Sequence, residues 1–411
     1  MSVSVSPQAA MGPKLLGGLA LVLALWLGWQ AWVRNLDEAC RLNEWPYLAR
    51  CAAQHDAPPA AQAAALLQRL ADNPGDSSAA VALAVLASEQ PDGRVAGVDA
   101  DAALDAALKV APQNGAVLSL QASRALRQQQ WTQALDPLIR LTQFHQSNAA
   151  ASLIGQLMAN AAQAPGLQQA LEAAAQTDGR WLARVIYQMP KDKIPVAHAM
   201  PAVAQAMAHG RLDTALGRFL IQRLKADGQW LEAYGVWQHL WNRPLALLFN
   251  GDFEQAFLPG GFDWEPGQNN AHRAGAQVMR AGRSDRGQVL QVSFTGRPMA
   301  AYVVRQDMLL TPGSYRFSGD YRVSDLRSQQ GLAWVFACAS GNREIARTAP
   351  MLPEGRNWQS QTLDFTVPPD CGLGVTLSLR TQAPYEATAG MRGDALFDRL
   401  RLERREGGSP P

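Results

Sequence analysis

The chain has 411 residues, of which 47% are hydrophobic and 18% are charged, a balance typical of folded globular domains rather than of disordered chains. A chain of this length is expected to form two to three domains. The formal net charge is only +2, so the composition gives no support to a function in nucleic-acid binding.

The first feature along the chain is an apolar, uncharged run from Leu15 to Val33. At about 1.5 Å per residue, a helix of this length would reach roughly 28 Å, enough to cross the hydrocarbon core of a bilayer. Trp26, Trp29 and Trp32 lie toward one end, where indoles favour the headgroup region. A cleaved signal peptide is the alternative, but the run is long for one and offers no small-residue cleavage site. We therefore expect a cytoplasmic leader over residues 1–14 and an uncleaved transmembrane helix over residues 15–33.

The four cysteines fall into two pairs, each within one region of the chain: Cys40 with Cys51, and Cys338 with Cys371. An even count divided in this way suits an oxidising compartment. The alternative is four unrelated buried thiols. We expect two disulfides, and hence a single-pass protein of the bacterial inner membrane with most of its chain in the periplasm.

Residues 37–245 are rich in Ala and Leu, and apolar residues recur there at helical spacing, as at Leu66, Leu67 and Leu70. Pro, Gly and Asn interrupt this pattern and predict helix hairpins. The predicted breaks are 73–75, 91–93, 112–114, 165–166 and 227–228.

Two segments of this helical region look like copies of one unit. Each has an Ala-Leu pair followed by an asparagine, and the asparagines, Asn114 and Asn148, are 34 residues apart, the tetratricopeptide period. Trp131 and Trp230 stand where that repeat often has an aromatic residue. The region resembles a tetratricopeptide-like α-solenoid, although no full consensus unit is present. The resemblance implies a groove that binds protein segments; a simple spacer is the alternative.

Near the end of the helical region, Trp230, Tyr234, Trp237 and Trp241 are three or four residues apart and share one helical face. We expect this face to be core, or the contact with the next domain, rather than a ligand platform.

Residues 246–406 change to segments with a period of two, separated by turns such as Thr311-Pro312-Gly313. Such short strands with no helices between them predict an antiparallel β-sandwich. The segments are 289–294, 301–306, 314–323, 332–338, 361–367, 375–380 and 395–402. Residues 407–411 are expected to be a disordered tail.

A set of short motifs follows one another through this region in a characteristic order. They are NGDFE at 250–254, FDW at 262–264, LQV at 290–292, LTPGSYRFS at 310–318, NW at 357–358, FTVP at 365–368 and FDRL at 397–400. Their order resembles the galactose-binding-like jelly roll of carbohydrate-binding modules of families 4, 9 and 22. A membrane-anchored helical-repeat chain that ends in such a module also resembles accessory proteins of bacterial exopolysaccharide assembly.

The resemblance implies a structural calcium ion that ties the first strand to the last. By position, Glu254 and Asp398 are the candidate ligands, and carboxylate oxygens suit Ca²⁺. The alternative is that both side chains accept hydrogen bonds from turn amides.

Sugar recognition needs aromatic faces that stack on pyranose rings and polar groups that bind hydroxyls. The sequence does not say which side of the sandwich each side chain faces. The glycan-binding candidates are Trp264, Tyr302, Tyr321, Trp334, Trp358 and Tyr385, with Arg280 and Arg380 as polar partners.

No Gly-rich phosphate loop, nucleophile elbow or His-Glu-x-x-His motif is found, and the six histidines are scattered. We therefore expect no enzymatic activity. The expected function is that of a membrane-anchored periplasmic accessory protein of exopolysaccharide assembly or export. It would bind polysaccharide through the jelly roll and partner proteins through the helical repeats. The alternative is a pure protein–protein scaffold of an envelope complex.

Overall fold

The computed structural model describes residues 57–267, 275–283, 285–299, 302–353 and 357–405. The chain divides into two compact units between Gln128 and Gln129. The expected transmembrane segment, Cys40 and Cys51 lie outside the described residues. Within the described ranges, no helix combines the length and the apolar character that a membrane span requires.

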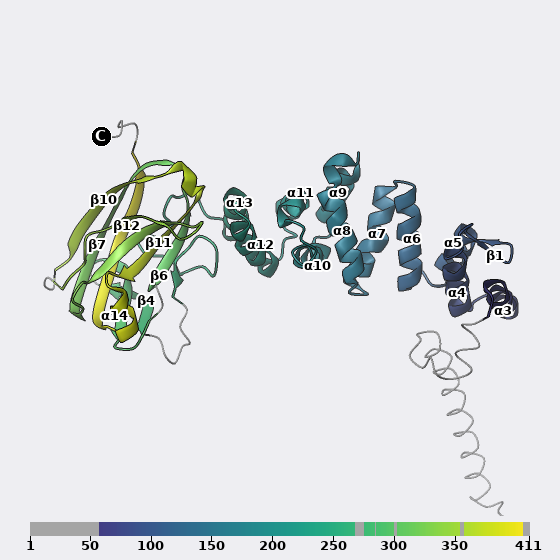
Figure 1. Cartoon of the computed structure of the whole chain (residues 1–411), viewed down its shortest axis with the longest axis horizontal. Coiled ribbons are helices and arrows are strands. Elements are labelled where there is room, and N and C mark those ends of the chain that lie inside the picture. Colours follow the sequence, from purple (N-terminus) through teal and green to yellow (C-terminus); the bar gives the residue numbers. More distant parts are fainter. Residues whose placement is uncertain (1–56, 268–274, 284, 300–301, 354–356, 406–411) are drawn as a thin grey trace, which may run out of the picture. The chain divides into compact units, whose positions relative to one another are not determined.

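The first unit is a small helical array (Figure 1). Its helices are α3 (Pro59–Asp72), α4 (Ser77–Ser88), α5 (Ala100–Val110) and α6 (Gly115–Arg127), with a short hairpin of β1 (Arg94–Val95) and β2 (Val98–Asp99). Ala84, Ala87 and Ala107 are completely buried, because small side chains let the helices approach closely. The predicted breaks at 73–75, 91–93 and 112–114 all fall between elements.

The second unit begins with further helices. They are α7 (Trp131–Gln143), α8 (Asn148–Ala159), α9 (Leu167–Thr177), α10 (Arg180–Gln188), α11 (Met200–Ala208), α12 (Thr214–Ala226) and α13 (Trp230–Trp241). Trp131 and Trp230 each begin a helix. The matched asparagines differ in role, because Asn114 caps α6 whereas Ser147, not Asn148, caps α8. The region fits a helical repeat.

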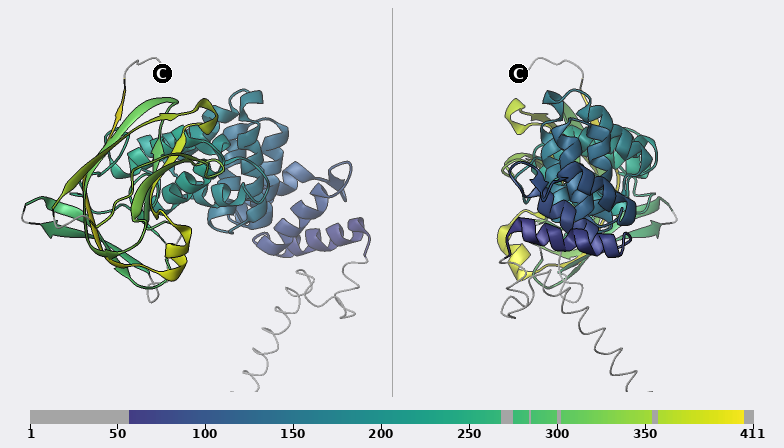
Figure 2. Two further views of the ribbon diagram at one scale, coloured as in Figure 1. Left: turned by 60° about the vertical axis from the view of Figure 1, so that its left-hand side comes forward. Right: turned by 90° about the vertical axis from the view of Figure 1, so that its right-hand side faces the viewer.

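The β-domain is a sandwich of two five-stranded antiparallel sheets, which confirms the predicted architecture (Figures 1 and 2). One sheet has the order β10-β7-β12-β5-β4 and the other β3-β6-β11-β8-β9. The strands are β3 (Glu265–Pro266), β4 (Ala276–Arg283), β5 (Gly287–Thr295), β6 (Val304–Leu309), β7 (Gly313–Arg327), β8 (Leu332–Cys338), β9 (Glu344–Arg347), β10 (Gln359–Val367), β11 (Gly374–Thr381) and β12 (Arg392–Arg404), with a short helix α14 (Pro384–Ala389). Strand β4 was missed by the sequence pattern because only Ala276 and Val278 among its residues pack against the core.

The core between the sheets is aromatic. Trp334 lies at its centre, with ring centroids 5.2 Å from Phe397 and 5.6 Å from Trp264. A disulfide joins Cys338, the last residue of β8, to Cys371, with a Cα–Cα distance of 5.1 Å. The predicted pairing of these two cysteines is confirmed.

The NGDFE segment packs against the end of β12. The Asn250 side chain forms two hydrogen bonds with the backbone of Gln255, and the Leu400 N–H donates to the Gly251 carbonyl at 2.8 Å. A Cβ built on Gly251 would lie 2.0 Å from the Leu400 carbonyl oxygen, so only glycine fits there. The Trp264 indole donates to the Asn250 carbonyl at 3.0 Å. The motif therefore specifies how the first loop closes onto the last strand.

The aromatic face of α13 forms the contact with the β-domain, as expected. Trp237 is fully buried, and its ring centroid lies 5.1 Å from Phe249 and 5.8 Å from Phe262. The Trp230 ring covers Gly374 at the start of β11, where a Cβ would come within 2.2 Å of the indole. These contacts place α12 and α13 against the outer side of the β3-β6-β11-β8-β9 sheet.

Candidate functional site

The outer face of the β10-β7-β12-β5-β4 sheet, called here the open face, is polar. Side chains alternate along a strand, so Tyr315 and Phe317 enter the core while Arg316 and Ser318 point outward. The register places Ser318 beside Thr362 on one neighbouring strand and Arg401 on the other. Outward members of the three strands are Ser360, Thr362, Asp364 and Thr366 on β10, Arg316, Ser318, Asp320 and Arg322 on β7, and Asp398, Arg401 and Glu403 on β12.

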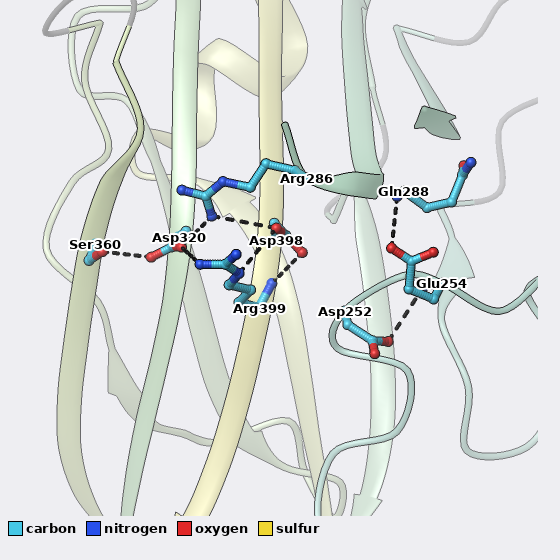
Figure 3. Close-up of polar contacts among 8 residues, drawn as sticks. All are labelled: Asp252, Glu254, Arg286, Gln288, Asp320, Ser360, Asp398 and Arg399. Atoms are coloured by element: carbon cyan, nitrogen blue, oxygen red, sulfur yellow. Dashed lines mark hydrogen bonds and ion pairs between the residues drawn. The ribbon is translucent and has the colours of Figure 1, made fainter. Parts of the chain in front are cut away.

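A buried ionic cluster lies on this face (Figure 3). Arg286, in the turn between β4 and β5, pairs with Asp320 on β7, and its Nη1 lies 3.4 Å from Asp398 Oδ2 on β12. Ser360 Oγ donates to Asp320 at 2.6 Å, and the Arg399 N–H donates to Asp398 at 2.7 Å. The side chains of Arg286 and Asp320 are 15% exposed and that of Asp398 is 3% exposed. One guanidinium is therefore shared by two carboxylates from neighbouring strands.

The two carboxylates of this cluster are shifted in opposite directions. Burial raises the pKa of Asp398 above its ordinary value, and the hydrogen bonds from Arg399 and Arg286 only partly offset it. Burial also acts to raise the pKa of Asp320, but hydrogen bonds from Ser360 and Arg286 outweigh it and lower that pKa. Asp320 is thus the ionic partner that holds Arg286 in place.

Trp358 adds an aromatic surface beside the cluster. The guanidinium carbon of Arg286 lies 4.4 Å from the Trp358 ring centroid, and that of Arg322 lies 5.4 Å away. Both distances are within the range of cation–π attraction. Trp358 is half-buried, and its indole N–H has no hydrogen-bond partner among the described residues. Trp358 therefore combines an apolar surface with a buried indole N–H that has no acceptor among the described residues.

The two residues expected to hold calcium have separate partners in the structure. Glu254 accepts a hydrogen bond from the Gln288 N–H at 2.9 Å, whereas Asp398 belongs to the Arg286 cluster, and Figure 3 shows no interaction between them. Across the described part of the chain, no three His, Cys, Asp or Glu side chains form a group that could hold a metal ion. The positive charge beside Asp398 comes from Arg286 and from Arg399, whose Nε lies 3.8 Å from Asp398 Oδ2. Glu254 instead binds a turn amide, which was the alternative reading.

The aromatic glycan-binding candidates are not brought together. Trp264 and Trp334 are 1% and 0% exposed and belong to the sandwich core, so neither offers a face to a ligand. Tyr321 points toward the core side of β7, with its hydroxyl bonded to Gln359. Tyr302 stacks with Arg305, 5.0 Å from the guanidinium carbon to the ring centroid.

Tyr385 on α14 is 53% exposed, and its hydroxyl donates to Gln329 at 2.9 Å. Trp358 is thus the one aromatic candidate, among those described, that lies beside the open face.

Neither arginine candidate lies on the open face with Trp358. Arg280 donates two hydrogen bonds of 2.7 Å to the carbonyls of Phe253 and Glu254, so it fastens the first loop to β4. Arg380 on β11, in the other sheet, donates to Ser378 at 2.7 Å and to Asn342 at 3.1 Å. Burial lowers the pKa of Arg380 below the ordinary arginine value. In these positions both guanidinium groups bind other parts of the domain.

Sequence reasoning missed Arg286, Asp320, Arg322 and Ser360. The alternation over 314–323 does place Asp320 and Arg322 on the polar side of their strand. Nothing in the sequence links Arg286 to partners that are 34 and 112 residues away.

Comparison with known proteins gives no match to a protein-family model and no match to a curated protein. Similar solved structures include a family-4 carbohydrate-binding module at 14% identity, covering 38% of this chain and 99% of that one with a TM-score of 0.31. The CBM22-1 xylan-binding domain from Paenibacillus barcinonensis Xyn10C has 13% identity, coverage of 38% and 94%, and a TM-score of 0.26. TmCBM61, in complex with β-1,4-galactotriose, has 16% identity, coverage of 39% and 100%, and a TM-score of 0.24. At these TM-scores the similarities carry no inference about what this chain binds.

Proposed function

We propose that the β-domain binds polysaccharide on the open face, beside Trp358. The observation that carries the proposal is the exposed, hydroxyl- and charge-bearing surface of β10, β7 and β12, with one half-buried indole at its side. A polysaccharide presents hydroxyls that donate and accept hydrogen bonds, together with apolar C–H faces. Thr362, Ser318 and Arg401 can bind the hydroxyls. The part of the Trp358 ring that Arg286 and Arg322 leave uncovered can stack on a C–H face.

The opposite side of the sandwich is less suited to this role. Lys225 and Trp230, from α12 and α13, contact Asp307 and Gly374 on that sheet. Among the described residues of the second unit, no helix residue forms an ion pair with the open face, so we take it as the surface of the sandwich that an extended chain can follow. Because the face is shallow, we expect affinities in roughly the millimolar to micromolar range.

The wider proposal places this domain in the bacterial envelope. In this proposal, residues 15–33 anchor the chain in the inner membrane and the residues that follow lie in the periplasm. There the protein assists exopolysaccharide assembly or export. The Cys338–Cys371 disulfide supports an oxidising compartment. In this proposal the helical region, read as tetratricopeptide-like, docks partner proteins of the assembly machinery. The chain has no catalytic role in it.

The test is a glycan array followed by calorimetry with the full chain. Thr362 is exposed at the centre of the open face, so Thr362→Tyr should block binding without loss of folding. Trp358→Ala should weaken binding. Thr177→Tyr, at an exposed position at the end of α9, makes the same change away from the face and should bind as the wild type does.

No glycan binding by the folded wild-type chain would instead favour the pure scaffold. Equal binding by wild type and Thr362→Tyr would exclude the open face as the site.

A further inference from the structure

A groove of about 540 Å³ lies in the helical part of the second unit, between the α7–α8 turn and α10. Its volume is in the range that admits a small ligand or a few residues of a peptide. Arg184 on α10 donates hydrogen bonds of 3.1 Å to the Gln146 carbonyl and to Asn148 Oδ1. Because these bonds tie the turn to α10, the walls of the groove are fixed before any ligand arrives.

The groove has an apolar part that solvent reaches. Phe144, at the end of α7, is 69% exposed, and Tyr187 is 41% exposed. Trp181 lines the groove, is only 1% exposed, and has an indole N–H with no hydrogen-bond partner among the described residues. A buried donor without an acceptor costs free energy that a ligand oxygen can recover.

The charge of the groove is positive. Arg180, Arg184 and Lys191 line it, and no Asp or Glu does. Asp178 neutralises Arg180 at 2.8 Å. The partners of Arg184 are uncharged, and Lys191 is exposed with no ion pair in the described part of the chain. Two positive charges are therefore available to an anionic ligand.

We propose that this groove binds an acidic peptide segment that carries one bulky apolar side chain. The apolar side chain would contact Phe144, and the acidic groups would pair with Lys191 and Arg184. Gln143 and Gln188 also line the groove, and each donates one amide hydrogen to a carboxylate, Asp178 and Asp192 respectively. The second amide hydrogen and the carbonyl oxygen of each side chain can bind a peptide backbone.

An acidic polysaccharide fits less well. Sugar rings need an open aromatic face, but Trp181 is buried and the Tyr187 ring packs against Phe219 with centroids 4.5 Å apart. Phe144 is then the most exposed aromatic side chain that lines the groove, and one such ring suits a single apolar side chain better than a row of sugar rings.

Peptide binding in this groove rests on the proposed function, in which the helical region docks partner proteins, and it names the site and the ligand chemistry of that docking. Peptide binding in the groove is independent of glycan binding by the β-domain, since the groove and the open face share no residue. The Thr362→Tyr variant tests glycan binding on the open face, and the groove variants described below test peptide binding. The two proposals can therefore fail separately.

The experiment selects binders from a phage-displayed library of random short peptides on the full chain. The selected peptides should be enriched in Asp and Glu around one Phe, Leu or Trp. Synthetic copies are then measured by fluorescence anisotropy against Lys191→Glu and Phe144→Ser, both at exposed positions. We expect each substitution to weaken binding by about tenfold or more. Lys109→Glu on α5 and Leu231→Ser on α13 make the same changes at exposed positions outside the groove and should leave binding unchanged.

Three results would overturn the proposal. One is a selection that yields no binders or yields basic peptides. Another is peptide binding that survives both groove variants. The third is displacement of the peptides by oligogalacturonate together with direct binding of that acidic sugar in the groove, which would assign the site to glycan.

Discussion

Lys225 on α12 and Asp307 on β6 form an ion pair across 82 residues of sequence. This ion pair joins the end of the helical region to the β-domain. The two side chains are 15% and 12% exposed. Lys225 also donates to the Gly261 carbonyl at 2.9 Å, and Asp307 accepts from Thr376 Oγ1 at 2.9 Å. Each side chain of the pair therefore has a second hydrogen-bond partner. Removing one member leaves the other charge largely buried and without its ionic partner.

Lys225→Met should therefore lower the free energy of unfolding by roughly 2–4 kcal/mol, since Asp307 loses its cation. Urea unfolding of the full chain measures the change. The double variant with Asp307→Asn should lose less than the two single losses added together. Lys109→Met, at an exposed position on α5, serves as the control and should have little effect. Strict additivity would show that the pair is not coupled.

The position of Arg286 leads to a prediction about how Ca²⁺ affects the stability of the β-domain. Because the Arg286 guanidinium and that of Arg399 already supply positive charge beside Asp320 and Asp398, added Ca²⁺ or a chelator should not change the melting temperature of the wild type. Arg286→Met should cost roughly 2–4 kcal/mol, because it leaves Asp320 and Asp398 with Arg399, which is 57% exposed and lies 4.0 and 3.8 Å from them, as their remaining cation.

The same variant should gain stability from millimolar Ca²⁺, which prefers carboxylate oxygens. Thermal unfolding with and without Ca²⁺ measures both effects. A wild-type protein that melts earlier in chelator would contradict this account of the cluster.

The Cys338–Cys371 bond closes a loop of 33 residues. By restricting the unfolded chain, such a loop contributes roughly 3–4 kcal/mol. The paired substitution Cys338→Ala and Cys371→Ala should therefore lower the denaturant midpoint markedly, and reductant should shift the wild type but not the variant. Mass spectrometry of the unreduced wild type should show no free thiol at either position.

The raised pKa of Asp263 predicts that the free energy of unfolding depends on pH. Burial raises its pKa from 3.8 to about 6, although the N–H groups of Leu258 and Trp264 donate to it. The folded chain thus holds this proton more tightly than the unfolded chain does. The resulting stabilisation is full below about pH 4 and is lost as the pH rises through about 6.

The stability of wild type relative to Asp263→Asn should fall by roughly 2–3 kcal/mol between pH 4 and pH 7. Urea unfolding at several pH values provides the measurement. A difference that does not vary with pH would mean that Asp263 keeps an ordinary pKa.

The sequence by itself determined the order of the architecture. Helical spacing up to Trp241, the period of two from residue 289 onward, and the Pro and Gly breaks are local signals, so they could be read directly. The pairing of Cys338 with Cys371 also followed from their shared region. Strand β4 was missed because its alternation is carried by small and charged residues that give no hydrophobic period.

Only the tertiary structure decided which side chains act together. Trp264 and Trp358 look alike as sequence, yet one fills the core and the other lies beside the open face, since strand register and sheet order decide exposure. Asp398 was expected to bind calcium, but its partner is Arg286, brought to it across 112 residues by the pairing of β12 with β5 and β7. Contacts between strands distant in sequence depend on the closure of the whole sandwich, and no local pattern along the chain records them.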